Sequence, residues 1–204
     1  MRQFAICRCG VRQTNAVVHP MQTAVNPDDV VETLDIWGVD LPSFNGEALA
    51  AKYAGLSGVS LTAEQEAVWN RIRNLAAPFL AANKLLFAVP LWNFGIPYRL
   101  KHLIDLISQK DILFSFDGNG FRGLLRARKA AVVYARGLDY LSAASSTPAM
   151  SYDFQKPYME TWLRLIGITD ISDIIVEKTL FGAEMDMEGR MKAKQTAMAL
   201  ASRF

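Results

Sequence analysis

The fold is indicated most clearly by residues 85–106, which read LLFAVPLWNFGIPYRLKHLIDL. Residues 85–89 form a short, wholly apolar run, which is typical of a strand that helices bury on both faces. Pro97 then stands where the first turn of a helix tolerates its missing N–H. Apolar residues recur after it at helical spacing, at Tyr98, Leu100, Leu103, Ile104 and Ile107. The stretch therefore predicts a strand, a turn and a helix in succession.

Strands and helices alternate in the same way along the rest of the chain. Strands are predicted over residues 30–37, 131–134 and 171–176, and helices over residues 61–83, 157–166 and 188–202. Thr62 followed by Gln65 is a capping-box pattern at a helix start. Residues 40–60 and 138–153, rich in Gly, Ser, Ala and Pro, are predicted to be long loops. The alternation indicates right-handed βαβ units in a parallel sheet, and we expect a single α/β domain over residues 1–204.

Composition and charge exclude several classes of function. The chain has 204 residues, 51% apolar and 21% charged, and a formal net charge of +2, which is too small to favour nucleic acid or anionic membranes. Its two cysteines, Cys7 and Cys9, are badly spaced for a disulfide, and a metal site would have only His19 and His102 to add. The N-terminus lacks the features of a signal peptide, and no apolar run approaches a membrane span. We expect a cytoplasmic protein without a metal.

Two predicted strand ends carry residues that suit a ligand, because ligands of open parallel sheets bind outside the carboxyl ends of the strands. After residue 89, Trp92, Asn93 and Phe94 could hold a flat heteroaromatic ring, with backbone N–H groups bonding its polar edge. The alternative is a hydrophobic turn with Trp92 and Phe94 in the core. After residue 134, Gly137 permits close approach of a ligand and Arg136 could offset its negative charge. The alternative there is a plain turn.

Other catalytic patterns are missing from the sequence. The acidic residues are scattered rather than paired, and no Gly-x-Ser-x-Gly, Walker or zinc motif occurs. His102 is either a general acid or a residue on the surface of its helix. The sequence therefore points to a cofactor that carries the chemistry, with no catalytic side chain assigned.

Residues 90–97 and the segments after them resemble the FMN-dependent NADH-azoreductases, flavodoxin-like quinone reductases related to DT-diaphorase. The likeness runs in order over residues 30–204 through the blocks 90–97, 100–101, 104–106, 114–116, 123–125, 129–130, 135–137, 157–158 and 165–170. It implies a flavodoxin-like fold with a five-stranded parallel sheet, order 2-1-3-4-5, and helices on both faces. It also implies a homodimer that binds FMN and reduces quinones or azo compounds with NADH or NADPH, by ping-pong hydride transfer.

The resemblance assigns residues to the FMN site by position. By this resemblance, two segments bind the flavin ring. The first is Leu91, Trp92, Asn93 and Phe94. The second is Ala135, Arg136, Gly137 and Leu138, in which Leu138 replaces the usual glycine. The substrate cavity, shared between two subunits, falls to Phe114, Phe116 and Trp162. The residues predicted to bind the FMN phosphate are Cys9, Arg12, Gln13 and Thr14. They lie in a loop that is shorter than usual and has Cys9 and Arg12 where serines are common.

The altered loop and the His19-Pro20 pair after it leave two further hypotheses. Residues 1–26 could have diverged from cofactor binding, which would make the chain a dimeric binding protein without FMN. A flavodoxin-type electron carrier is the other alternative, but such a carrier should have a strongly acidic docking face, and the net charge of +2 argues against one.

Overall fold

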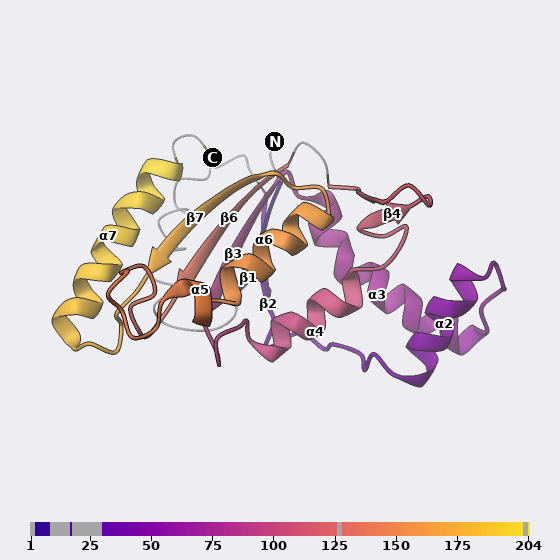
Figure 1. Ribbon diagram of the computed structural model, residues 1–204. Helices are drawn as coiled ribbons and strands as arrows, with labels where there is room; N and C mark the ends of the chain where they lie inside the picture. Colours follow the sequence, from indigo (N-terminus) through magenta and orange to yellow (C-terminus); the bar gives the residue numbers. More distant parts are fainter. Residues whose placement is uncertain (1–2, 9–16, 18–29, 126–127, 202–203) are drawn as a thin grey trace.

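The computed structural model describes residues 3–8, 17, 30–125, 128–201 and 204, and its centre is a parallel sheet (Figure 1). The sheet has five strands in the order β2-β1-β3-β6-β7, and neighbouring strands pair in parallel. Their bounds are β1 Gln3–Arg8, β2 Val30–Asp35, β3 Lys84–Pro90, β6 Lys129–Ala135 and β7 Asp170–Val176. The predicted α/β class with a parallel sheet is confirmed.

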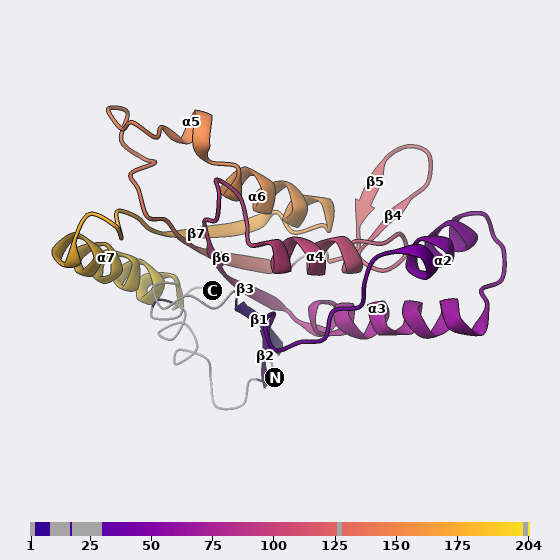
Figure 2. The ribbon, with the colours of Figure 1, turned by 90° about the horizontal axis from the view of Figure 1, so that it is seen from below.

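Helices cover both faces of the sheet (Figure 2). One core cluster joins alternate residues of β3 and β6 to α3 (Ala63–Ala81), α4 (Tyr98–Ile107) and α6 (Gln155–Leu165). A second cluster joins the intervening residues to α7 (Ala183–Ala201) and Val17. Within β3, Phe87 therefore faces α6 while Ala88 faces α7, which explains why this strand is apolar and buried from Leu85 to Pro90.

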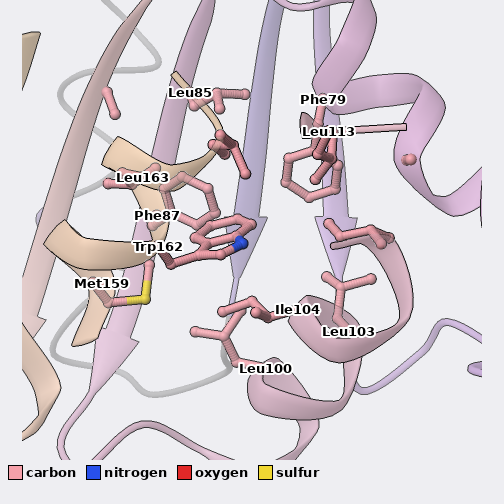
Figure 3. Packing of buried hydrophobic residues seen from close by; sticks show 14 of the residues in the cluster. Phe79, Leu85, Phe87, Leu100, Leu103, Ile104, Leu113, Met159, Trp162 and Leu163 are labelled. Atoms are coloured by element: carbon pink, nitrogen blue, oxygen red, sulfur yellow. The ribbon is translucent and has the colours of Figure 1, made fainter. Parts of the chain in front are cut away.

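The larger cluster is organised around Phe87 (Figure 3). Its ring lies 6.3 Å from the ring of Phe79 and 5.7 Å from that of Trp162. Trp162 is buried, and its indole N–H donates to the hydroxyl of Ser108 at 2.9 Å. A buried tryptophan with a satisfied N–H is a core residue of large apolar area.

Several element boundaries differ from those predicted. The capping box is confirmed, with Thr62 as N-cap of α3. The strand predicted over 30–37 ends at Asp35, because the Asp35 carboxylate and carbonyl bind the following N–H groups and form a turn. Helices α6 and α7 begin earlier than predicted. The loops predicted over 40–60 and 138–153 were wrong in part, since they contain α2 (Gly46–Leu56) and the single turn α5 (Ala149–Tyr152).

A small antiparallel hairpin, β4 (Phe114–Phe116) and β5 (Phe121–Gly123), lies apart from the main sheet. Its base packs on the turn before β7: a Cβ added at Gly123 would lie 2.0 Å from the backbone nitrogen of Gly167. The hairpin thus lies at the amino ends of the strands, away from their carboxyl ends (Figure 1). In the part of the chain that is described, no helix combines the length and apolarity that crossing a bilayer needs.

Candidate functional site

Two of the three segments assigned to the FMN site lie side by side at the carboxyl edge of the sheet. β3 and β6 are neighbours, with Pro90 opposite Ala135. Beyond them the N–H of Leu91 donates to the carbonyl of Ala135 at 2.8 Å. We call residues 91–95 the β3 turn and residues 135–138 the β6 turn. The structure therefore brings together the segments that the sequence assigned to the flavin ring.

The β3 turn is tight and has an unusual backbone. Trp92 and Gly95 exchange backbone hydrogen bonds of 3.0 and 2.9 Å. Between them Asn93 and Phe94 have φ of 45° and 69°, as a type I′ turn requires at both central residues. Asparagine tolerates this region, but a bulky residue such as Phe94 rarely occupies it. Such strain costs about 1–3 kcal/mol and is common at functional sites.

The side chains of the β3 turn point outward. Trp92 is 39% exposed and Phe94 is 44% exposed, so the alternative that placed both rings in the core is wrong. The Phe94 ring lies 5.5 Å from that of Tyr152, and the Phe94 carbonyl accepts from the N–H of Phe154 at 2.9 Å. Among the residues with described positions, the N–H groups of Asn93 and Phe94 meet no acceptor. The turn therefore offers a ligand both aromatic surface and backbone donors.

The β6 turn has the opposite character, because Arg136 is buried. Its guanidinium forms ion pairs with Asp153 at 2.5 Å and Glu177 at 3.2 Å, and its Nε donates to Gln155 at 3.2 Å. It also lies over the rings of Tyr134 and Tyr140. The suggestion that the Arg136 side chain offsets the charge of a ligand is therefore wrong. Its charge is matched by carboxylates in the interior, and its backbone N–H and carbonyl bond to Val176 and Thr179.

Gln155 connects the two turns. It accepts from Arg136, and its amide nitrogen donates to the carbonyl of Val89 at 2.9 Å, just before the β3 turn. Asp153 accepts from the backbone N–H groups of Gln155 and Lys156 and so begins α6 as well as pairing with Arg136. Burial raises the pKa of the Glu177 carboxyl, although the hydrogen bond from Arg136 opposes the effect. Sequence reasoning missed these residues; an Asp two residues before an amphipathic helix was the available signal.

The rest of the β6 turn is shaped by the segment after β7. The carbonyls of Gly137 and Leu138 accept from the N–H groups of Leu180 and Lys178 at 3.1 and 3.3 Å. A Cβ at Gly137 would lie 2.6 Å from the end of the Leu180 side chain, so the glycine permits a close approach. Within the described chain, the N–H groups of Gly137 and Leu138 meet no acceptor.

The remaining sequence-assigned residues lie elsewhere. Phe114 and Phe116 lie on the hairpin at the other end of the sheet, where their rings contact that of Phe121 at 5.4 and 5.2 Å. Trp162 is in the core, which argues against a contact with substrate. Cys9, Arg12, Gln13 and Thr14 lie outside the described residues; the strand before them, β1, ends with Arg8 opposite Ala88 of β3.

The residues at this edge fit the flavin of FMN. A flavin ring is flat and apolar over most of its area and has carbonyl oxygens and nitrogens along one edge. Exposed aromatic side chains suit the ring, and the N–H groups of Asn93, Phe94, Gly137 and Leu138 suit its polar edge. These donors project from adjacent strand ends, where ligands of this class of sheet bind.

Comparisons with known proteins identify the family of the chain. A family model described as a flavodoxin-like fold matches residues 12–200. The FMN-dependent NADH:quinone oxidoreductase 9 of Burkholderia lata is 58% identical over 179 residues, which are 88% of this chain and 85% of that protein. The FMN-dependent NADH:quinone oxidoreductase 3 of Pseudomonas fluorescens is 50% identical over 179 residues, 87% of this chain and 82% of that protein.

Solved structures support the fold. The azoreductase of Bacillus anthracis superposes with a TM-score of 0.88 at 23% identity, and the match covers 100% of both chains. A second structure from that organism, an FMN-dependent NADH-azoreductase in complex with FMN, superposes with a TM-score of 0.84 at 20% identity, covering 98% of this chain and 100% of that one. At these identities the likeness establishes a flavodoxin-like fold.

Proposed function

This chain belongs to the family of FMN-dependent NADH:quinone oxidoreductases, and on that premise we propose that it reduces quinones with electrons from NADH. The observation that carries the proposal is the pairing of the β3 turn with the β6 turn. Their unbonded N–H groups and exposed aromatic rings lie at one strand edge. The strand order β2-β1-β3-β6-β7, which is the 2-1-3-4-5 order of a flavodoxin, supports the same assignment. A single domain over residues 1–204 is part of the proposal.

The proposed roles of the residues follow from what each turn offers. The N–H groups of Asn93 and Phe94, with the Asn93 side-chain amide, donate to the polar edge of the flavin and stabilise negative charge on it. The N–H groups of Gly137 and Leu138 do the same from the neighbouring strand. Leu91, Trp92 and Ala135 complete the apolar surround. When bound, FMN would supply two-electron hydride chemistry between NADH and the acceptor.

The phosphate of FMN is assigned to Cys9, Arg12, Gln13 and Thr14, on the resemblance of this segment to the family's phosphate loop. A guanidinium and a hydroxyl suit a phosphate, and strand ends followed by a helix start commonly bind one. We also propose that NADPH can replace NADH as the electron donor and that azo compounds are further electron acceptors. A cytoplasmic location belongs to the same proposal.

We further propose a homodimer. Phe114 and Phe116 lie on the hairpin at the amino ends of the strands, so they can contribute to an acceptor cavity only in a second copy of the chain. Sedimentation velocity tests this: a dimer is expected, and a monomer at micromolar concentration would contradict it. A Phe116→Ala variant should then lower kcat/KM for the quinone without lowering the FMN content.

Steady-state kinetics test the activity. With the FMN-reconstituted protein, NADH oxidation should require a quinone, and double-reciprocal plots at several quinone concentrations should be parallel, because donor and acceptor bind in turn. Intersecting lines would contradict the ping-pong order. A flavodoxin-type carrier would not oxidise NADH without a separate reductase, and a protein that had lost FMN binding would gain no activity from added FMN.

A further inference from the structure

Trp37, Trp92 and Tyr98 form a surface cluster that we call the aromatic wall. The ring of Trp37 lies 5.6 Å from that of Trp92 and 5.6 Å from that of Tyr98, and the rings of Trp92 and Tyr98 are 6.5 Å apart. The three side chains are 38%, 39% and 67% exposed. Because Trp92 belongs to the β3 turn, the wall extends the site outward from the position proposed for the flavin.

Local turn geometry and a distant arginine both fix Trp37. The backbone N–H of Trp37 donates to the carboxylate of Asp35 at 3.0 Å. Arg99 of α4 donates to the carbonyls on either side, that of Ile36 at 3.0 Å and that of Val39 at 2.7 Å. One guanidinium thus holds the loop that carries Trp37 against the helix that carries Tyr98.

His102 adds a second connection between the same two segments. Its Nε2 lies 3.0 Å from the carbonyl oxygen of Pro42 and donates to it. The residue is partly buried and bonded to the loop, so it is not simply a residue on the helix surface. Loop and helix therefore form one unit, and the wall is built before any ligand binds, which lowers the entropic cost of binding.

The charges beside the wall favour a neutral ligand. The wall itself presents three aromatic rings and no charged group. Asp35 and Asp40 lie on its loop; Asp40 pairs with Arg71 at the surface, at 2.6 Å. The Arg99 guanidinium bonds to backbone carbonyls rather than pointing outward. A diphosphate such as that of NADH would meet carboxylates here, whereas a flat neutral ring would stack without an electrostatic cost.

We propose that the aromatic wall binds the part of a multi-ring aromatic acceptor that extends beyond the flavin, so that Trp37 and Tyr98 set the preference for two-ring over one-ring quinones. The inference rests on the proposed function, since the acceptor must be one that the FMN enzyme reduces. Arg99 and His102 are positioning residues in this account, because they act through the loop that holds Trp37.

The test compares naphthoquinone with benzoquinone at saturating NADH, using the FMN-loaded enzyme and its Trp37→Ala and Tyr98→Ala variants. The quantity measured is the ratio of kcat/KM for the two quinones, relative to the same ratio in the wild-type enzyme, so that their different reduction potentials cancel. Each variant should lower the ratio by roughly three- to tenfold, which corresponds to the loss of one aromatic contact. Tyr53→Ala, an exposed tyrosine on α2 outside the site, should leave it unchanged.

Three results would overturn the proposal. An equal loss of kcat/KM for both quinones would show that the wall does not distinguish two-ring from one-ring quinones. A higher KM for NADH with an unchanged ratio would assign the wall to the dinucleotide. Weaker dimerisation of Trp37→Ala in sedimentation, with an unchanged ratio, would show that a second copy covers it. Failure of the proposed function itself is distinct, because the wild-type protein would then fail to oxidise NADH with either quinone.

Discussion

The β3 turn and the β6 turn lie on adjacent strands at one edge of the sheet, yet they are fixed in opposite ways. The β3 turn has exposed rings and two non-glycine residues with positive φ, and it is held by ring contacts on the surface. The β6 turn is held by Arg136, whose side chain is buried in ion pairs with Asp153 and Glu177. Both turns present backbone N–H groups to the same space.

The difference indicates that the β6 turn contributes mainly to the stability of the fold, whereas the β3 turn contributes mainly to ligand binding. Buried charges are stable only when all of them are paired, so the β6 turn should tolerate few changes. The β3 turn depends on local backbone conformation and partly exposed rings, and changes there should affect the ligand more than the fold. Substitutions at four positions test this contrast, in order of decreasing effect.

Arg136→Met should have the largest effect on stability. It leaves Asp153 and Glu177 buried without a cation, which typically costs about 3–5 kcal/mol. Urea unfolding of the FMN-free protein would measure the loss. Arg164→Met, which removes an exposed arginine from α6, should change the free energy of unfolding by less than about 0.5 kcal/mol. Similar losses of unfolding free energy in the two variants would show that the buried Arg136 does not stabilise the β6 turn.

Gln155→Leu should cause the next largest loss of unfolding free energy. It removes the donor to the Val89 carbonyl and the acceptor for Arg136, and buried polar groups that lose their partners cost about 1–3 kcal/mol. Because Gln155 joins the two turns, FMN affinity should fall together with stability. A variant of normal stability and normal FMN affinity would show that the two turns are not coupled through this side chain.

Asn93→Ala and Asn93→Gly separate the backbone of the β3 turn from its side chain. Alanine at a φ of 45° should cost about 1 kcal/mol of unfolding free energy, while glycine, which accepts this conformation, should cost almost nothing. Both variants lose the amide and should bind FMN more weakly by a similar factor. Unfolding and FMN titration are measured on each. If FMN affinity follows stability instead, the side chain has no direct role.

Glu177→Gln should have the smallest effect, visible as a dependence on pH. Since burial raises the pKa of Glu177, the folded protein holds this proton more tightly than the unfolded chain. Its contribution to stability should therefore fall as the pH rises from the unfolded pKa, about 4.3, through the raised folded pKa. The difference in unfolding free energy between wild type and variant should show this slope. A slope of the opposite sign would mean that Arg136 outweighs burial.

Much of the fold was predictable because its signals are local. The apolar run of β3, the proline before α4 and the Thr62–Gln65 capping box each act over a few residues, and each is found in the structure. The β3 turn could be recognised for the same reason. Helix α2 was missed because its large residues Leu49 and Tyr53 are exposed while alanines face the core, which inverts the usual pattern.

Contacts between distant parts of the chain could not be predicted. Nothing near Arg99 in the sequence indicates that it binds the loop carrying Trp37, because the partners lie about sixty residues apart. Arg136 was interpreted as a residue facing a ligand, since arginines are seldom buried unless paired. Its partners, Asp153 and Glu177, come from two other segments, and only the folded chain brings them together.

An anaerobic titration shows whether the β3 and β6 turns hold a flavin through which electrons pass from NADH to a quinone. The purified protein, incubated with FMN and freed of excess, should be yellow. NADH should bleach its flavin absorbance, and a following addition of quinone should restore it. A colourless protein that gains no flavin band from FMN, or a band that NADH does not bleach, would contradict the account.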